Sequence, residues 1–392
     1  MFLLAIIGSF SAALLLSWGL NWLALIPWRR TAGQHWAERA RILYPIRVGA
    51  RINVLFITAT CVLAGKVFCH GDLTSLWLFG VFGFLGVIVG TYPFDREVLP
   101  WLRFQGCIHH VISCWLLLLG WLFVFIGAGL LMPEQFGWIS LILAVVVFGI
   151  RLWLDWGLAF KLLDLLRILR PPPERLQRIV SEAAQVMNVS VRRVWLLHAA
   201  GSYAAVFPTT RELIFSERLL ELHPDEEVAA ICAHELGHLT ESRMVLAGRI
   251  VGSFTLFPLI FAKPLFHLEE PWNALAIMML GIFVFSLQRL SRRLSRKMEV
   301  RADKVAAENA VNAVTYARAL ERLYEANQIP AVMRSNHLTH PHLYDRMLSA
   351  GVTPDYPRPK RPGLWAWNRV IGILLLIVIY ILAESTISVT TF

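Results

Sequence analysis

The fold is decided by residues 224–238, which read PDEEVAAICAHELGH. A proline followed by three acidic residues favours the start of a helix, because acids stabilise the positive end of the helix dipole. On that helix His234 and His238 are four residues apart and share one face, so both imidazoles can bind one metal ion. Glu235, next to the first imidazole, can accept a proton from an activated water. The stretch therefore predicts a catalytic zinc centre.

A third ligand must come from another part of the chain, because catalytic zinc usually has three protein ligands and one open position. No histidine follows soon after His238. Glu299 and Asp303 are four apart on a second predicted helix. One carboxylate can bind zinc while the other orients a ligand histidine. The alternative is that both acids are solvated and pair with Arg296 or Arg301.

The order of four motifs resembles one protein family. H-E-x-x-H, two hydrophobic hairpin spans and E-x-x-x-D are similar to the membrane gluzincin zinc metalloproteases, which include HtpX heat-shock proteases and type I CAAX prenyl endopeptidases. Residues 202–205 occupy the place of the family's strand motif, with Ser where Asn is usual. His340-Pro341 and Arg346 form the downstream H-P-x-x-x-x-R element. The resemblance covers about 171–350.

The resemblance implies one Zn²⁺ per chain, with His234, His238 and Glu299 as ligands. It also implies that Glu235 is the catalytic base and that Asp303 orients a ligand histidine.

Further roles follow from the same resemblance. His340 and Arg346 would stabilise the oxyanion or hold the substrate backbone. The family often has Asn and Asp where this chain has Glu241 and Arg243, so no helper role is predicted for those two residues. An extended substrate would pair with the edge of the strand that contains Ser202, Tyr203, Ala204 and Ala205.

Composition points to a membrane protein. Of the 392 residues 57% are hydrophobic and only 16% are charged, against about 25% charged in soluble proteins. This balance excludes a disordered chain and argues against a purely soluble enzyme. The formal net charge is +10, which fits basic cytoplasmic loops better than nucleic-acid binding, because no nucleic-acid motif is present. The five cysteines form no C-x-x-C pair, so no thiolate metal site is predicted.

Eight apolar runs are close to the length that spans a bilayer, which is about 20 helical residues. Their flanks follow the positive-inside rule: arginines are dense after the first and seventh runs, and absent from the turns at 70–72, 132–137 and 267–271. We therefore expect both termini outside and the zinc site on the cytoplasmic side of a bacterial inner (plasma) membrane. The runs lie near 2–26, 48–69, 73–92, 107–131, 138–158, 246–266, 272–288 and 367–383.

The predicted fold is mainly α: a polytopic α-helical membrane protein of about eight spans, with a zincin-like metalloprotease domain that carries a small edge β-sheet. The predicted parts are an N-terminal transmembrane region of about five spans, a first part of the metalloprotease domain, a transmembrane hairpin, a second part of that domain, and a C-terminal span with its tail. They cover 1–158, 159–245, 246–288, 289–363 and 364–392.

The predicted function is a zinc-dependent metalloendopeptidase that hydrolyses membrane-associated or misfolded proteins, a role in protein quality control. Alternatives are a processing protease for one membrane-tethered substrate and a catalytically silent membrane scaffold. The retained Glu235 argues against a scaffold. An intramembrane site-two-type protease is disfavoured because no N-P-D-G or L-D-G element occurs. A channel or transporter is disfavoured because the spans are nearly free of charge. The expected partners are protein or peptide substrates and the lipid bilayer.

Overall fold

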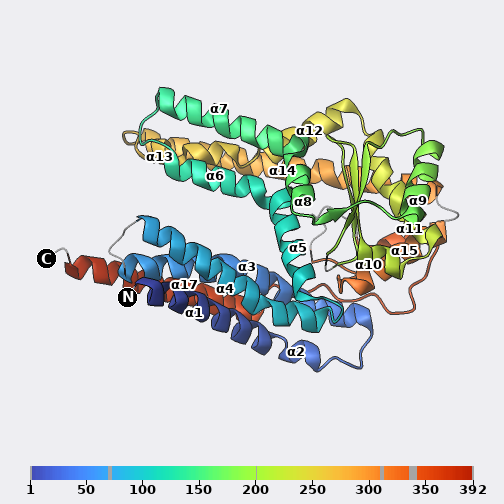
Figure 1. Cartoon of the computed structure of the whole chain (residues 1–392), viewed down its shortest axis with the longest axis horizontal. Coiled ribbons are helices and arrows are strands. Elements are labelled where there is room, and N and C mark those ends of the chain that lie inside the picture. The colour runs from blue at the N-terminus through green and yellow to red at the C-terminus, as the bar shows by residue number, and fades with distance from the viewer. Residues whose placement is uncertain (1, 69–72, 200, 310–312, 335–341, 391–392) are drawn as a thin grey trace. The chain divides into compact units, whose positions relative to one another are not determined.

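The computed structural model of the chain describes residues 2–68, 73–199, 201–309, 313–334 and 342–390. It is mainly helical and contains one small sheet (Figure 1). The chain forms two compact units. The domain boundaries predicted from the sequence follow the spans rather than these units, and they stay predictions. Unit 1 comprises Met1–Phe104, Tyr324–Arg334 and Pro354–Phe392, and unit 2 comprises Gln105–Leu323 and Ser335–Thr353.

Unit 1 is a bundle in which α1 packs on α4, and α3 packs on both α4 and α17. Glycines allow the closest of these approaches. A Cβ atom added to Gly86 or Gly90 of α4 would lie 2.3 Å from the carbonyl oxygen of Phe10 or Leu14 in α1. Small residues four apart permit such close packing of apolar helices. The helices are α1 (Phe2–Ala24), α2 (Ile26–Arg29), α3 (Trp36–Phe68), α4 (Leu73–Val98) and α17 (Trp367–Thr390).

A buried amide cluster joins three of these helices. The side chain of Asn53 in α3 donates to the carbonyl oxygen of Asn368 in α17 at 2.8 Å. Asn368 in turn donates to Asn21 of α1 at 3.2 Å and to the carbonyl oxygen of Ile46 at 3.0 Å. Polar side chains inside an apolar bundle hydrogen-bond across helices in this way and fix their relative rotation.

The apolar helices of unit 2 lie before and after the sheet in sequence. Buried side chains of α6, α7 and the 3₁₀ segment Phe257–Phe261 form one apolar cluster. The sixth predicted span is broken near Pro258, where α12 has ended and a 3₁₀ segment follows, because proline cannot donate a helical hydrogen bond. Pro264 lies within the first turn of the short helix α13. The elements are α5 (Phe104–Cys114), α6 (Gly120–Leu131), α7 (Trp138–Trp153), α8 (Ala159–Leu165), α12 (Arg243–Ser253), α13 (Ala262–Phe266) and α14 (Trp272–Asn309), with π-helical segments at Trp115–Leu119 and Leu154–Leu158.

The sheet has four strands in the order β1-β2-β4-β3. β2 pairs parallel with β4, and the β3–β4 hairpin is antiparallel, so β3 is an edge strand. Successive β4 residues face opposite sides, as a strand requires. Leu213 and Phe215 pack with α9 and α11, while Ile214 packs with α8. The elements are β1 (Leu169–Arg170), α9 (Glu174–Val186), β2 (Arg193–Leu197), β3 (Ala204–Phe207), β4 (Glu212–Ser216), α10 (Glu217–Leu222), α11 (Asp225–Gly237), α15 (Ala313–Ala326) and α16 (Leu343–Ser349).

The predicted number of eight spans is not confirmed. Within the described residues, six helices are long and apolar enough to cross a membrane. The predicted run 107–131 is divided between α5, a π-helical segment and α6. The second predicted span starts near 48, but α3 already begins at Trp36. The arginines at 39, 41 and 47 therefore lie on α3 and not in a loop. Arginine is a good helix former, so its presence does not prevent the helix from starting early.

Candidate metal centre

Helix α11 positions the two histidines of the H-E-x-x-H motif. It begins after Pro224, has three acids in its first turn, and ends at Gly237, so His238 opens a 3₁₀ turn rather than continuing the helix. His234 and His238 are 8% and 7% exposed. Their ring centroids are 5.1 Å apart and their planes are nearly perpendicular. Two buried imidazoles thus converge on one point.

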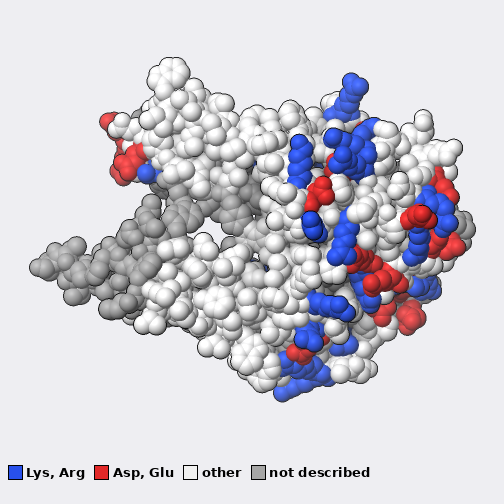
Figure 2. Space-filling model, in the orientation of Figure 1, with Lys and Arg blue, Asp and Glu red and all other residues white. Residues whose placement is uncertain are grey.

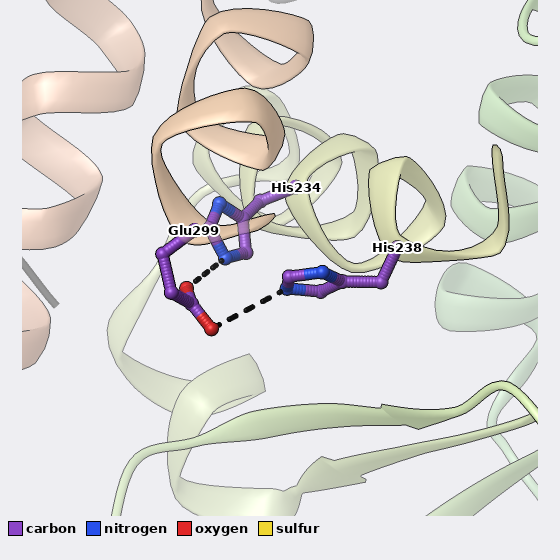
Figure 3. A group of neighbouring side chains, drawn as sticks. All are labelled: His234, His238 and Glu299. Carbon is purple, nitrogen blue, oxygen red and sulfur yellow. Dashed lines mark ion pairs between the residues drawn. The ribbon is translucent and has the colours of Figure 1, made fainter. Parts of the chain in front are cut away.

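Helix α14 adds the carboxylate of Glu299 to this point (Figure 3). One Glu299 oxygen lies 3.4 Å from Nε2 of His234, and the other lies 3.8 Å from Nε2 of His238. Ligand atoms of the three residues lie within 4.8 Å of one another, and they are the one such group found in the described ranges. Gly237 lies against Ala302 and Val305 of α14, so the two helices are in contact at the motif.

The electrostatic environment of the cluster favours positive charge. Burial lowers the pKa of His234, but hydrogen bonds to Asp303 and Glu299 and the charge of Glu235 outweigh burial and raise it to about 9. A buried imidazole attracts a proton this strongly only where carboxylates surround it. The same surroundings suit a divalent cation.

Behind His234 lies a buried hydrogen-bonded group of Asp303, Tyr316 and Arg346. The hydroxyl of Tyr316 donates to Asp303 Oδ1 at 2.7 Å and lies 2.7 Å from His234 Nδ1. Arg346 donates to that hydroxyl oxygen at 2.9 Å and also pairs with Asp303. Burial raises the pKa of Tyr316 well above its usual value, so the hydroxyl keeps its proton. Since this proton goes to Asp303, His234 Nδ1–H faces two acceptors, the phenolic oxygen and Asp303 Oδ1, which is 3.2 Å from Nδ1. This leaves the Nε2 lone pair for a metal.

Behind His238 lies Glu241, for which the sequence predicts no helper role. Its carboxylate is 3.9 Å from Nδ1 of His238 and 3.7 Å from the guanidinium of Arg301. Burial raises the pKa of Glu241, and the charge of Arg301 opposes this rise. Each histidine of the motif therefore has a carboxylate on its Nδ1 side.

Glu235 projects toward the edge strand. One of its carboxylate oxygens accepts a hydrogen bond from the backbone N–H of Val206 in β3 at 2.9 Å. In an antiparallel pair, backbone groups of successive residues point alternately toward and away from the partner strand. Val206 N–H therefore points away from β4, and the predicted base lies along the outer edge of the sheet.

The four predicted substrate-binding residues differ in their burial and in whether their backbone groups point toward β4 or toward the outer edge of the sheet. Ser202 is fully buried. The carbonyl oxygen of Tyr203 accepts from Ser216 N at 2.9 Å, and Ala205 is in register with Ile214 of β4. By the alternation along β3, Ala204 presents its backbone groups outward. The role of these four residues in substrate binding stays a prediction.

The H-P-x-x-x-x-R element is described in part. His340 and Pro341 lie outside the described residues. Arg346, in α16, has a side chain that is only 9% exposed and contacts Asp303. Its role in stabilising the oxyanion or holding the substrate backbone stays a prediction.

Comparison with known proteins agrees with this geometry. Residues 172–350 match the family model of Peptidase family M48. The match confirms the resemblance predicted from the four motifs, and the family implies metallopeptidase activity for this part of the chain. No curated protein sequence matches the chain.

Two imidazole nitrogens and one carboxylate are a donor set typical of catalytic zinc. Divalent ions that prefer all-oxygen sites, such as Ca²⁺ and Mg²⁺, fit it less well. The residues therefore suit a zinc ion held by three protein ligands.

Proposed function

We propose that the protein is a membrane-embedded zinc metalloendopeptidase that cleaves extended segments of membrane-associated or misfolded proteins on the cytoplasmic side. The observation that carries the proposal is the convergence of His234, His238 and Glu299 beside Glu235 and the edge strand β3. One zinc ion per chain would be held by the first three residues. Zinc supplies Lewis acidity at such sites and lowers the pKa of water toward 7.

Glu235 is the proposed general base. Its carboxylate accepts the proton of the attacking water and later delivers it to the leaving amine. The hydrogen bond from Val206 N–H fixes one carboxylate oxygen and leaves the other to receive the proton. The hydrogen-bonded group behind His234 holds that imidazole in the tautomer that binds metal.

The edge strand accounts for selection of extended substrates. A peptide that adds to β3 as a further strand would use the outward backbone groups of Ala204 and would run past Glu235. A folded domain exposes no such backbone. Unfolded segments and tethered tails do, which supports a role in quality control.

The site is proposed to lie close to the membrane surface. The 3₁₀ turn that His238 opens ends at Thr240, and α12, which continues into a candidate span, begins at Arg243. Only Glu241 and Ser242 lie between the two elements, so the ligand His238 is five residues from the start of the candidate span. The arginine-rich flanks support a cytoplasmic site in a bacterial plasma membrane. Processing of one dedicated membrane-tethered substrate would use the same residues, and a silent scaffold would not need Glu235.

The test of catalysis is Glu235→Gln in the full chain. The amide is similar in size but cannot accept the proton, so cleavage should fall by about 10²–10⁴-fold, while zinc content measured by elemental analysis is unchanged. Glu226→Gln is the matched control, because Glu226 is an exposed acid on the same helix. Cleavage by Glu235→Gln at the wild-type rate would refute the mechanism.

The test of substrate class uses one unfolded reporter, prepared both as a soluble protein and as a fusion to a spanning helix, in the same liposomes. We expect preferential cleavage of the tethered form. Equal cleavage of both forms, or cleavage of the soluble form alone, would contradict the proposed preference for membrane substrates.

A further inference from the structure

A basic face begins where the apolar part of α14 ends. The apolar part, before residue 289, carries exposed hydrophobic side chains such as Met279, Phe283 and Phe285. The basic face that follows has positions three and four apart, which places its side chains along one side of the helix over about 10 Å. Its members are Arg289, Arg292, Arg293 and Arg296, with Lys297 at its margin.

None of these five basic residues forms an ion pair with a carboxylate within the described part of the chain. Other arginines of unit 2 do: Arg170 pairs with Glu217, Arg175 with Asp225, and Arg318 with Glu321. Four members of the basic face are exposed, and Arg296 is half-buried. The basic face therefore presents concentrated positive charge without an internal counter-ion.

The side chains of the basic face enclose two shallow hollows. The first has a volume of about 300 Å³ and is lined by Phe285 and Gln288 together with the four arginines. The second, about 620 Å³, lies between Arg293, Arg296 and Lys297 and the apolar Leu290, Leu294 and Val300. Guanidinium groups bind phosphate oxygens in pairs. Phe285 adds an apolar wall on the side from which acyl chains would come.

We propose that the basic face of α14 binds the phosphate headgroups of anionic phospholipids. The positive-inside rule explains the sign of this charge but not its concentration on one face without carboxylate partners. A phospholipid is favoured over a soluble anion because the same helix continues directly into exposed apolar side chains. Figure 2 shows charged side chains gathered on one part of the molecule and a largely uncharged surface over the rest. The inference rests on the membrane embedding in the proposed function, but not on catalysis.

Binding is measured on the full chain with Glu235→Gln, purified in detergent, by native mass spectrometry with added phosphatidylglycerol or phosphatidylcholine. We expect tighter binding of phosphatidylglycerol. Replacing the four arginines by Gln should weaken this binding by at least about tenfold, since each basic residue near an anionic surface contributes about fivefold. The control replaces Arg192, Arg193, Arg211 and Arg318, which removes equal charge from other elements and should leave binding unchanged.

A second variant distinguishes the loss of lipid binding from wrong insertion of the protein into the membrane. Lys at all four positions keeps the charge that orients the span, but it cannot bind two phosphate oxygens at once. It should weaken binding by about threefold or more. Wild-type affinity in both variants, or equal loss in the control, would overturn the proposal. Competition by glycerol phosphate at the lipid's own concentration would also overturn it, because the site would then recognise a soluble phosphate.

Discussion

The phenolic oxygen of Tyr316 lies 2.7 Å from Nδ1 of His234, and the two rings are nearly parallel, with centroids 6.0 Å apart. The tyrosine therefore helps to orient the imidazole, together with Asp303, whose Oδ1 lies 3.2 Å from the same nitrogen. Groups that hold a metal-binding histidine in this way commonly contribute about 10–100-fold to metal affinity.

Tyr316→Phe should weaken zinc binding by about tenfold, because His234 Nδ1–H loses the nearer of its two acceptors and keeps only Asp303 Oδ1 at 3.2 Å. Zinc affinity is measured by competition with a chromophoric chelator. Tyr324→Phe, which removes a hydroxyl further along the same helix, serves as the control. An equal loss in both variants would mean that the effect is structural.

Glu299→Gln should lose zinc, because a neutral amide is a poorer ligand than a carboxylate. Elemental analysis of the purified variant checks this. Glu308→Gln is a matched control, since Glu308 is an exposed acid further along α14. Full zinc content in Glu299→Gln would assign the third ligand to another residue.

Zinc affinity should increase with pH through the physiological range. The pKa of His234 in the metal-free protein is raised to about 9, so the imidazole is protonated at pH 7 and must lose that proton to bind metal. Binding should tighten by about tenfold from pH 7 to pH 8. A histidine of ordinary pKa, about 6.5, would give almost no change over this interval.

The variant Asp303→Asn provides the control for this pH dependence. Among the charged neighbours of His234, Asp303 raises the pKa of the imidazole most, and this substitution removes its carboxylate. The variant's affinity should depend less steeply on pH. An identical slope in both proteins would show that another group releases the proton.

Proline at two positions of β3 should separate catalysis from substrate binding. Val206→Pro removes the N–H that holds Glu235, so kcat should fall by about tenfold with unchanged zinc content. Ala204→Pro removes an outward donor available to the substrate and should instead raise KM. Both positions lie on an edge strand, where proline is tolerated. The same kinetic change in both variants would contradict this division.

The predicted orientation can be tested by labelling in a cysteine-free chain. An impermeant thiol reagent added outside should label Glu134→Cys and Glu269→Cys but not Val300→Cys, and all three native residues are exposed. The reverse pattern would place the metal centre on the outer side.

Each half of the metal cluster has a local sequence signal, and the order of motifs along the chain links the two halves through the family resemblance. Spacings of four place His234 with His238, and Glu299 with Asp303, on single helix faces. The β3–β4 hairpin is equally accessible, since two short strand-like runs flank a turn. Each helix pair and the hairpin can be recognised from a short stretch of consecutive residues, whereas joining Glu299 to the two histidines requires the order of the motifs.

Tyr316 cannot be found in the same way. It lies 82 residues from His234 and belongs to an amphipathic helix in which a tyrosine is an ordinary core residue. Glu241 is discounted by the sequence because it departs from the family pattern, although the fold turns it toward His238. The number of spans also cannot be predicted from the sequence, because hydropathy does not show where a helix begins or breaks within an apolar region.

One continuous helix, α14, carries both an apolar stretch from Trp272 and the ligand Glu299. Glu299 lies eleven residues beyond 288, or about 16 Å along the helix axis. Spanning helices tilt when the bilayer thickness does not match their apolar length. A tilt of about 5° would displace Glu299 by roughly 1.4 Å relative to a fixed pivot at the membrane surface. If α14 spans a bilayer as proposed, a change in bilayer thickness would reach the ligand Glu299 through the tilt of this one helix.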